Sequence, residues 1–349
     1  MAHRRADHHA RVPRSRARPR GSDPPSVLKE CRVPDSPRHE LAHLGHHALL
    51  TPTLEETLAY FVDLLGMDEV EERDGSHYLR AFGDYERWSL KLTPSEQAGL
   101  EYASWRTASA DALERRVAWL EENGHGGAWV PQDLGDGREY EFADPDGHVF
   151  RLYFDTEGYV APEGKRPVIP VNFQAYAGRG ANLRHVDHLN LLARDVRANR
   201  RFWEQGFGLR TYEIIQLPDG AEAGAWMSAT IQGHELIYTQ ERTSGSARLH
   251  HFAYLVDTRE EVLRAAEIFA DARIHIEAGP SRHTAIQGFY LYTREPGGNR
   301  IEIANGGYLV FAPDREPYVW TAEEWATKPG WGAPIPPEFH VYGTPDVAR

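Results

Sequence analysis

The chain has 349 residues, 41% hydrophobic and 11% aromatic, which is a globular composition with enough material for about two domains. Its net charge of −13 argues against nucleic-acid binding by the body of the chain, and no run of about 18 apolar residues predicts a membrane span. The single cysteine, Cys31, excludes an intrachain disulfide and favours a reducing, cytoplasmic location.

Residues 1–40 differ in charge from the rest of the chain, with ten Lys/Arg against five Asp/Glu. The opening MAHRRADHHARVPRSRARPRGSDPPS is rich in Arg, His and Pro and has no apolar periodicity, so we expect a basic disordered tail. It lacks the apolar core of a secretory signal peptide. Organelle targeting or contact with an anionic polymer stays open, and we assign no catalytic role to His3, His8 and His9.

Residues 41–154 predict a first domain of strands and helices. Within it, 41–67 and 100–124 each predict a strand followed by a helix, and Ser109 is the expected N-cap of the second helix. Short segments of alternating polarity predict further strands, at SHYLRAF (76–82), ERWSLKLT (86–93) and DPDGHVFRLYF (144–154). A connection containing Pro and Gly, 155–182, follows this domain.

Residues 183–308 repeat the first domain. LRHVDHLNLLARDVRANRRFWEQGFGL (183–209) matches 41–67 at a constant offset of 142, LHHFAYLVDTREEVLRAAEIFADAR (249–273) matches 100–124 at 149, and EPGGNRIEIAN (295–305) matches 144–154 at 151. Thr258 is the N-cap equivalent to Ser109. The remaining residues, 309–349, form a tail rich in Trp and Pro that we expect to pack on the second domain.

This order of elements predicts an α+β fold of tandem βαβββ modules. Each half holds two modules, so the chain has about four, and their antiparallel hairpins form sheets that curl around a cavity. The repeat therefore predicts two similar halves, with the same structural residues in both.

The two halves can be compared at three equivalent strand positions, and they differ at two of them. The second half has His188, His251 and Glu302 where the first has His46, Tyr102 and Arg151. Structural roles are shared between two copies of a fold, whereas chemistry can be confined to one copy. The bland alternative is two core histidines and a carboxylate on the wet face of its strand.

His188, His251 and Glu302 are the ligand set of a facial triad, which suits Fe(II) or Mn(II) and leaves positions open for substrate and O2. Strand alternation assigns His185 and His250 to the faces opposite His188 and His251, so we expect one histidine of each pair in the cavity. The spacing of these ligands has no local signature such as HExxH, and the prediction depends on the repeat.

The second half resembles the type I extradiol dioxygenases of the vicinal oxygen chelate superfamily, and among them the catechol 2,3-dioxygenases. The resemblance spans about 41–345 and is densest in 183–308. It depends on the motifs LRHVDHLNL, GHELIY, RLHHFAY, GPSRHTAIQGFYLY and GGNRIEI.

The resemblance implies ring opening of a catechol by O2 beside its hydroxyls, giving a 2-hydroxymuconic semialdehyde in aromatic-compound degradation. It implies metal ligation by His188, His251 and Glu302, and catalytic, substrate-binding roles for His234, His283 and Tyr292. It also implies a homo-oligomer, a homotetramer or homodimer, with a small catechol and O2 as partners.

One position in the sequence indicates whether the substrate carries a charge. Family members that accept carboxylated catechols often have Arg just before the GPxRH motif, where this chain has Ala278. That difference favours a neutral catechol, alkylcatechol or aryl catechol, although Arg282 could face the pocket.

Two other functions remain open at this point. One is a metal-dependent isomerase or thiol transferase of the same fold, in which ligands come from two modules on different halves or chains. Tyr102 and Arg151 argue against it because they replace His and Glu in the first half. The other is a metal-free aromatic-binding protein, which would leave the three candidate ligands unexplained.

Overall fold

A computed structural model describes residues 39–347 with the exception of 177, 244, 246, 313 and 329. Residues 36–349 form one compact unit. The predicted basic tail, 1–40, lies outside the described residues except for His39 and Glu40, and Glu40 forms an ion pair with Arg115. Among the described residues, no helix is long and apolar enough to cross a membrane.

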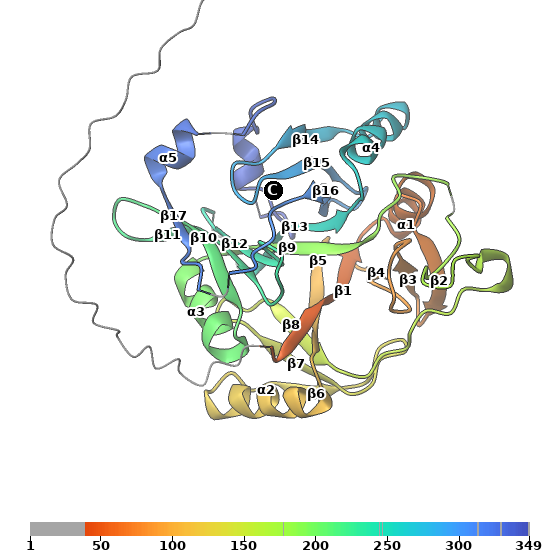
Figure 1. Cartoon of the computed structure of the whole chain (residues 1–349), viewed down its shortest axis with the longest axis horizontal. Coiled ribbons are helices and arrows are strands. Elements are labelled where there is room, and N and C mark those ends of the chain that lie inside the picture. The colour runs from red at the N-terminus through yellow and green to blue at the C-terminus, as the bar shows by residue number, and fades with distance from the viewer. Residues whose placement is uncertain are drawn as a thin grey trace, which may run out of the picture. The chain divides into compact units, whose positions relative to one another are not determined.

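Four βαβββ modules follow one another along the chain, as the repeat predicted (Figure 1). The first consists of β1 (Leu41–Thr51), α1 (Leu54–Ala59) with the π-helical turn η1 (Tyr60–Leu64), β2 (Asp68–Arg73), β3 (Ser76–Arg80) and β4 (Leu90–Pro94). The second consists of β5 (Gly99–Thr107), α2 (Ala110–Glu122), β6 (Ala128–Val130), β7 (Glu139–Ala143) and β8 (Val149–Tyr153).

The second half repeats this order after a connection that contains the short helix η2 (Glu163–Lys165). The third module consists of β9 (His185–Ala193), α3 (Val196–Phe207), β10 (Arg210–Gln216), β11 (Glu222–Ser228) and β12 (Leu236–Gln240). The fourth consists of β13 (Arg248–Leu255), α4 (Arg259–Asp271), β14 (Ile276–Arg282), β15 (Gly288–Arg294) and β16 (Arg300–Gly306). The elements that follow are β17 (Tyr318–Thr321), α5 (Ala322–Thr327) and η3 (Pro337–His340).

Each half builds one sheet with the first strands of its two modules paired antiparallel at the centre. The order is β2-β3-β4-β1-β5-β8-β7-β6 in the first sheet and β14-β15-β16-β13-β9-β12-β11-β10-β17 in the second. The last strand, β17, extends the second sheet by pairing parallel to β10, so the tail after Gly307 does pack on the second half. The described strands therefore form the α+β architecture that the sequence predicted.

The helix boundaries follow from the capping residues. The Ser109 side chain accepts a hydrogen bond from the backbone N–H of Ala112, and Thr258 forms a capping box with Glu261. Helix α3 ends at Gly208, whose φ of +71° is a left-handed conformation that glycine adopts without a steric penalty. Ser109 and Thr258 thus cap equivalent helices of the two halves.

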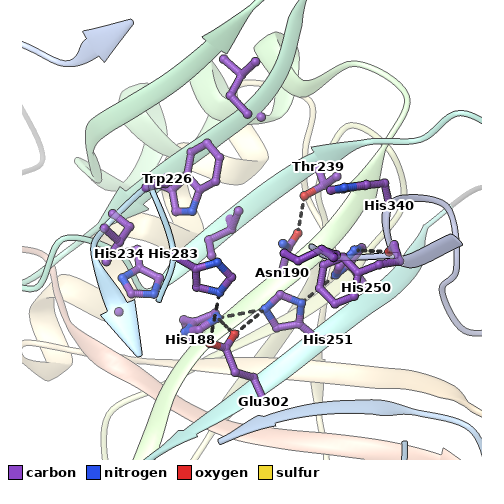
Figure 2. A pocket seen from close by; sticks show the side chains of 18 of the residues that line it. His188, Asn190, Trp226, His234, Thr239, His250, His251, His283, Glu302 and His340 are labelled. Atoms are coloured by element: carbon purple, nitrogen blue, oxygen red, sulfur yellow. Dashed lines mark hydrogen bonds and ion pairs between the residues drawn. The ribbon is translucent and has the colours of Figure 1, made fainter. Parts of the chain in front are cut away.

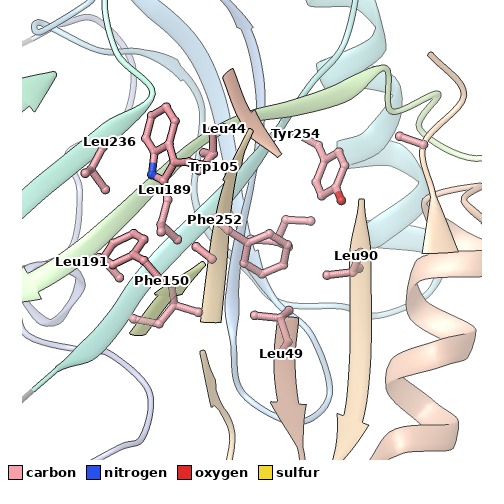
Figure 3. Packing of buried hydrophobic residues seen from close by; sticks show 14 of the residues in the cluster. Leu44, Leu49, Leu90, Trp105, Phe150, Leu189, Leu191, Leu236, Phe252 and Tyr254 are labelled. Atoms are coloured by element: carbon pink, nitrogen blue, oxygen red, sulfur yellow. The ribbon is translucent and has the colours of Figure 1, made fainter. Parts of the chain in front are cut away.

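One hydrophobic core joins the two sheets. Apolar side chains of both halves interleave in it, including those labelled in Figure 3: Leu44, Leu49, Leu90, Trp105, Phe150, Leu189, Leu191, Leu236, Phe252 and Tyr254. The rings of Trp105 and Trp203 lie 5.8 Å apart across the junction. The inner face of each sheet is therefore buried against the other half.

Strand alternation then assigns the other face of the second sheet to the cavity. In β9, Leu189 and Leu191 enter the core while His188 and Asn190 line the cavity. In β12, Ile237 lines the cavity in the same way. The core that joins the halves thus also positions the candidate ligands.

Candidate metal centre

Three side chains from three neighbouring strands meet at the cavity wall: His188 of β9, His251 of β13 and Glu302 of β16 (Figure 2). The Oε2 atom of Glu302 lies 3.1 Å from Nε2 of His188 and 3.2 Å from Nε2 of His251. The two nitrogens are 2.9 Å apart. All three side chains are buried, and they form one of two groups of described residues with the spacing to hold a metal ion.

Strand pairing explains why these residues meet. Ala253 of β13 lies opposite His188 in the antiparallel pair with β9, and opposite Glu302 in the parallel pair with β16. His251 lies two residues before Ala253, so its side chain points to the same face of the strand. Residues far apart in sequence are thereby brought to one point, as the repeat predicted.

The residue before His188 contacts its ring. Oδ2 of Asp187 lies 2.7 Å from Nδ1 of His188 and 3.7 Å from Nε2 of His234. Asp187, His188 and His234 form the second group with metal-binding spacing. Because Nδ1 of His188 has this carboxylate partner, its Nε2 is the nitrogen free to bind a metal.

The expectation for His250 was wrong. Strand alternation assigned it to the face opposite His251, yet both line the cavity, and their Nδ1 atoms are 2.7 Å apart. The pairing of β13 with β9 shifts register between Leu249 and His251, so a bulge at His250 breaks the alternation. The remaining ring nitrogen of His250 lies 2.9 Å from the carbonyl oxygen of Phe339.

The buried charges of the centre suit a cation. Burial raises the pKa of Glu302, but the neighbouring His188 outweighs it and holds that pKa well below its usual range. Burial lowers the pKa of His188, and the charge of Glu302 more than compensates, raising it to about 9. Glu302 thus stays ionised and buried without a Lys or Arg partner among its ion pairs, so a divalent ion held by two imidazoles and this carboxylate would balance its charge.

The other predicted residues line the same cavity. Tyr292 Oη donates to Oε2 of Glu302 at 2.6 Å and lies 2.9 Å from Nε2 of His283. His234 packs beside His188 with ring centroids 4.4 Å apart. Burial, then the charge of His188, lowers the pKa of His234 to about 3, so its imidazole is neutral.

The cavity has a volume of about 310 Å³ and reaches beyond the metal-binding residues. Its far wall is largely apolar, with side chains from β10, β11, β12, α5 and the segment before η3: Ile215, Leu217, Ala223, Trp226, Ile237, Trp325 and Ile335. Polar groups at the wall that sequence reasoning missed include Asp187, Asn190, Thr239, Arg242, His250 and His340. Comparison of the two halves could not identify most of these residues, because the equivalent positions of the first half hold different residue types.

Arg282 does not face the cavity. Its guanidinium hydrogen-bonds both the backbone and the side chain of Gln287, and it is absent from the cavity wall. Ala278 is buried against Tyr290 and Phe339 rather than exposed to the cavity. Of the arginines that the structure describes, only Arg242 lines the cavity, and it is exposed at the rim.

The equivalent positions of the first half hold a different arrangement. Nη1 of Arg151 lies 2.9 Å from Glu139 and 3.7 Å from Asp133, and the Tyr102 hydroxyl donates to Asp133. A guanidinium therefore occupies the place that Glu302 has in the second half. Among the described residues, no metal-binding group forms there.

Comparisons with known proteins agree with this geometry. The model of the Glyoxalase/Bleomycin resistance protein/Dioxygenase superfamily matches residues 43–152 and 185–303. A metapyrocatechase of Geobacillus stearothermophilus is 36% identical over 90% of this chain and 96% of its own length. A manganese-dependent 2,3-dihydroxybiphenyl 1,2-dioxygenase of Geobacillus genomosp. 3 is 36% identical over 82% of this chain and 91% of its own.

Among solved structures, homoprotocatechuate 2,3-dioxygenase of Arthrobacter globiformis aligns with a TM-score of 0.78 at 25% identity, covering 89% of this chain and 94% of that enzyme. Both halves match the superfamily model. The two repeated sheets and the similarity to dioxygenases over nearly the whole length agree with that match. The chain therefore belongs to the Glyoxalase/Bleomycin resistance protein/Dioxygenase superfamily.

Proposed function

We propose that the protein is a catechol 2,3-dioxygenase-like enzyme that opens catechol rings beside their hydroxyls. The observation that supports it most is the buried set His188, His251 and Glu302, which opens on a cavity that also holds His234, His283 and Tyr292. The names of the relatives, metapyrocatechase and two other ring-cleaving dioxygenases, support the same reaction. Both atoms of O2 enter the product, so the reaction needs no further reductant.

The donor set fits Fe(II), and Mn(II) is the second candidate because one relative is named manganese-dependent. A divalent ion held there would act as a Lewis acid that makes catechol hydroxyls easier to deprotonate, and it would provide a path for electrons from the substrate to O2. His188, His251 and Glu302 would hold it from one side, which leaves the cavity side open to substrate.

The protein's own groups would move the protons. His234 is neutral and next to His188, so it accepts a proton and returns it when the O–O bond breaks. The His283–Tyr292 pair hydrogen-bonds a substrate oxygen and helps to remove its proton. Burial raises the pKa of Tyr292 well above its ordinary value, so the tyrosine acts as a hydrogen-bond donor.

A neutral catechol is the proposed substrate class. The cavity is mostly apolar away from the ligands, and neither Ala278 nor Arg282 supplies a cation to its wall. Arg242 lies at the rim, where water weakens its attraction for a substrate carboxylate.

The alternatives have less support. An isomerase or thiol transferase with ligands from both halves would need His or Glu where the first half has Tyr102 and Arg151, which pair internally. A metal-free binding protein would have no use for an ionised Glu302 buried between two imidazoles.

The test is anaerobic loading with Fe(II), then addition of catechol and air while oxygen uptake and absorbance are recorded. We expect a yellow product and one O2 consumed per catechol. The same assay with 3,4-dihydroxyphenylacetate tests the substrate class, since a preference for the acid would reject the neutral one. Stoichiometric metal without oxygen uptake for any catechol would reject ring cleavage.

We also propose a homo-oligomer, a dimer or tetramer. Large apolar side chains stay exposed on the single chain, among them Val168 at 97%, Val171 at 83% and Phe311 at 75%. Light scattering on the purified protein would reject this part of the proposal if it gave the mass of one chain, 39.5 kDa.

A further inference from the structure

Each candidate histidine ligand has its Nδ1 atom bonded to the residue immediately before it. For His188 that residue is Asp187, a carboxylate of the kind that commonly orients the ring of a metal-binding histidine. For His251 it is His250, with 2.7 Å between the two Nδ1 atoms. The bulge in β13 makes this second contact possible, because a regular strand would point the two rings to opposite faces.

His250 is bonded in turn to the short helix η3. Nε2 of His250 lies 2.9 Å from the carbonyl oxygen of Phe339 in η3. Three groups are therefore linked in order: the Phe339 carbonyl, the His250 ring and the His251 ring. Nε2 of His251, at the far end, points at Glu302.

The groups at the two ends of this series determine which ring nitrogens of His250 and His251 bear a hydrogen. A carbonyl oxygen only accepts, so Nε2 of His250 must bear the hydrogen of that bond. A metal ligand needs a lone pair, so Nε2 of His251 must be bare when it binds and its Nδ1 must bear the hydrogen. Nδ1 of His250 is then the acceptor of this bond, and Nη1 of Arg300, 3.4 Å from the same atom, is a further donor beside it.

We propose that His250 is a positioning residue, which sets the tautomer and ring orientation of His251 for metal binding and ties both to the segment 337–344. This inference rests on the proposed metal centre. It adds a residue that touches neither metal nor substrate in the proposal and acts through His251.

The segment is held firmly enough to fix the carbonyl. Leu249 and Thr344 exchange backbone hydrogen bonds of 2.8 and 2.9 Å beside the bulge. Arg248, buried, donates to the carbonyls of Val341 and Gly343. The carbonyl that orients His250 is therefore attached to the same strand that carries His251.

The first half has neither the two orienting residues nor the full set of candidate ligands. The position equivalent to His250 is Glu101, and the position equivalent to Asp187 is Gly45. The orienting residues thus differ between the halves at both positions, although one of the two histidine ligands, His188, has an equivalent histidine in His46. This is expected if the orienters serve a metal that only the second half binds.

The test measures binding of Mn(II) alone to the full chain, by competition with a chelator and by the electron paramagnetic resonance spectrum of the bound ion. His250→Phe keeps an aromatic ring without an acceptor, and we expect about 10- to 100-fold weaker binding with an altered spectrum. His250→Asn keeps an acceptor near Nδ1 and should restore most of the affinity. His250→Gln reaches toward Phe339 but offers no acceptor near Nδ1, and should stay weak.

His148→Phe is the matched control. His148 is a buried histidine of the first half whose ring nitrogens also have two partners, Asp144 and the Leu192 carbonyl. It contacts none of the candidate ligands by any described bond. We expect this variant to lose stability while keeping the affinity and spectrum of the wild type.

The outcomes separate the two proposals. If the wild type binds neither Mn(II) nor Fe(II), the proposed function fails. If the wild type binds Mn(II) and His250→Phe binds it equally well with the same spectrum, the positioning role is rejected and the function stands. If His250→Phe does not fold, His250→Asn and His250→Gln are compared with each other instead. Equal Mn(II) affinities of these two variants would also reject the positioning role.

Discussion

The two halves solve one problem of buried charge in different ways. In the second half, Glu302 faces His188 and His251 across a gap that fits a divalent ion. In the first half, Arg151 supplies a permanent cation to Glu139 and Asp133. Both copies of the fold therefore place buried carboxylates at this point of the sheet. An arginine balances their charge in the first half, and a divalent ion balances it in the proposed metal centre of the second.

A second difference concerns the histidine that both halves keep. His46 is enclosed by Glu86 at 2.7 Å and Asp136 at 3.3 Å, and its ring stacks on Trp88 with centroids 3.9 Å apart. His188 has His234 at the position where His46 has Trp88. An indole thus packs on the histidine of the first half, and an imidazole packs on that of the second.

The sharpest test of this comparison is to change one of the three compared strand positions in each half. Glu302→Gln removes the negative ligand, and we expect metal affinity to fall at least 100-fold and ring cleavage about 1,000-fold, because transition-state charge stabilisation by the ion is worth several kcal/mol. Tyr102→Phe, at the first-half equivalent of His251, should keep full metal content. Metal analysis and oxygen uptake check both. Equal losses in the two variants would show that the halves are not specialised.

The next test concerns His234, whose ring packs beside that of His188. His234→Asn removes the group that exchanges protons, so turnover should fall about 100- to 10,000-fold while catechol affinity changes little. Single-turnover kinetics and anaerobic catechol titration separate the two effects. Unchanged turnover would remove His234 from the mechanism, although its place beside His188 would remain.

A smaller effect is expected for stability in the first half. Burial lowers the pKa of His46, but Asp136 and Glu86 outweigh it and raise the value to about 9. Since the folded value exceeds the ordinary 6.5, the stabilisation is complete below pH 6.5 and is lost as the pH rises through about 9.

His46→Gln should accordingly lower the free energy of unfolding by on the order of 2 kcal/mol at pH 6 and by much less at pH 10. Urea unfolding of both proteins at the two pH values measures this difference, and metal content serves as the control. A difference that grew with pH would mean that His46 is neutral in the folded state.

The smallest expected effect is at the rim of the cavity. Arg242→Gln should leave the KM for catechol within about twofold, because an exposed cation contributes about 0–1 kcal/mol to a neutral ligand's site at most. Steady-state kinetics with catechol and with 3,4-dihydroxyphenylacetate check this. A large loss confined to the acid would assign Arg242 to substrate selection and extend the substrate class.

The repeat explains what could be predicted from sequence and what could not. Equivalent positions predicted the modules, the caps at Ser109 and Thr258, and the meeting of the three candidate ligands, because these depend on strand and helix periods. His250 was misassigned because a bulge depends on the pairing partner of a strand, which one sequence does not reveal.

The rest of the cavity wall was missed for a related reason. Trp226, Trp325 and Phe339 belong to elements that reach the cavity only through tertiary packing, and two of them come from beyond the repeated region. No period in the sequence connects them to the ligands. Their position follows from β17 joining the edge of the second sheet and from η3 resting on β13.

The link between Phe339 and His250 has a consequence for synthesis. A ribosome releases His188, His251 and Glu302 tens of residues before it releases η3, so the nascent chain holds all three ligands before the carbonyl that orients His251 exists. Sheet and ligands can assemble during translation, but the hydrogen-bonded chain behind His251 is completed only afterwards. With His250 in its proposed role, metal binding at full affinity thus requires the folding of a segment that is made after all three ligands.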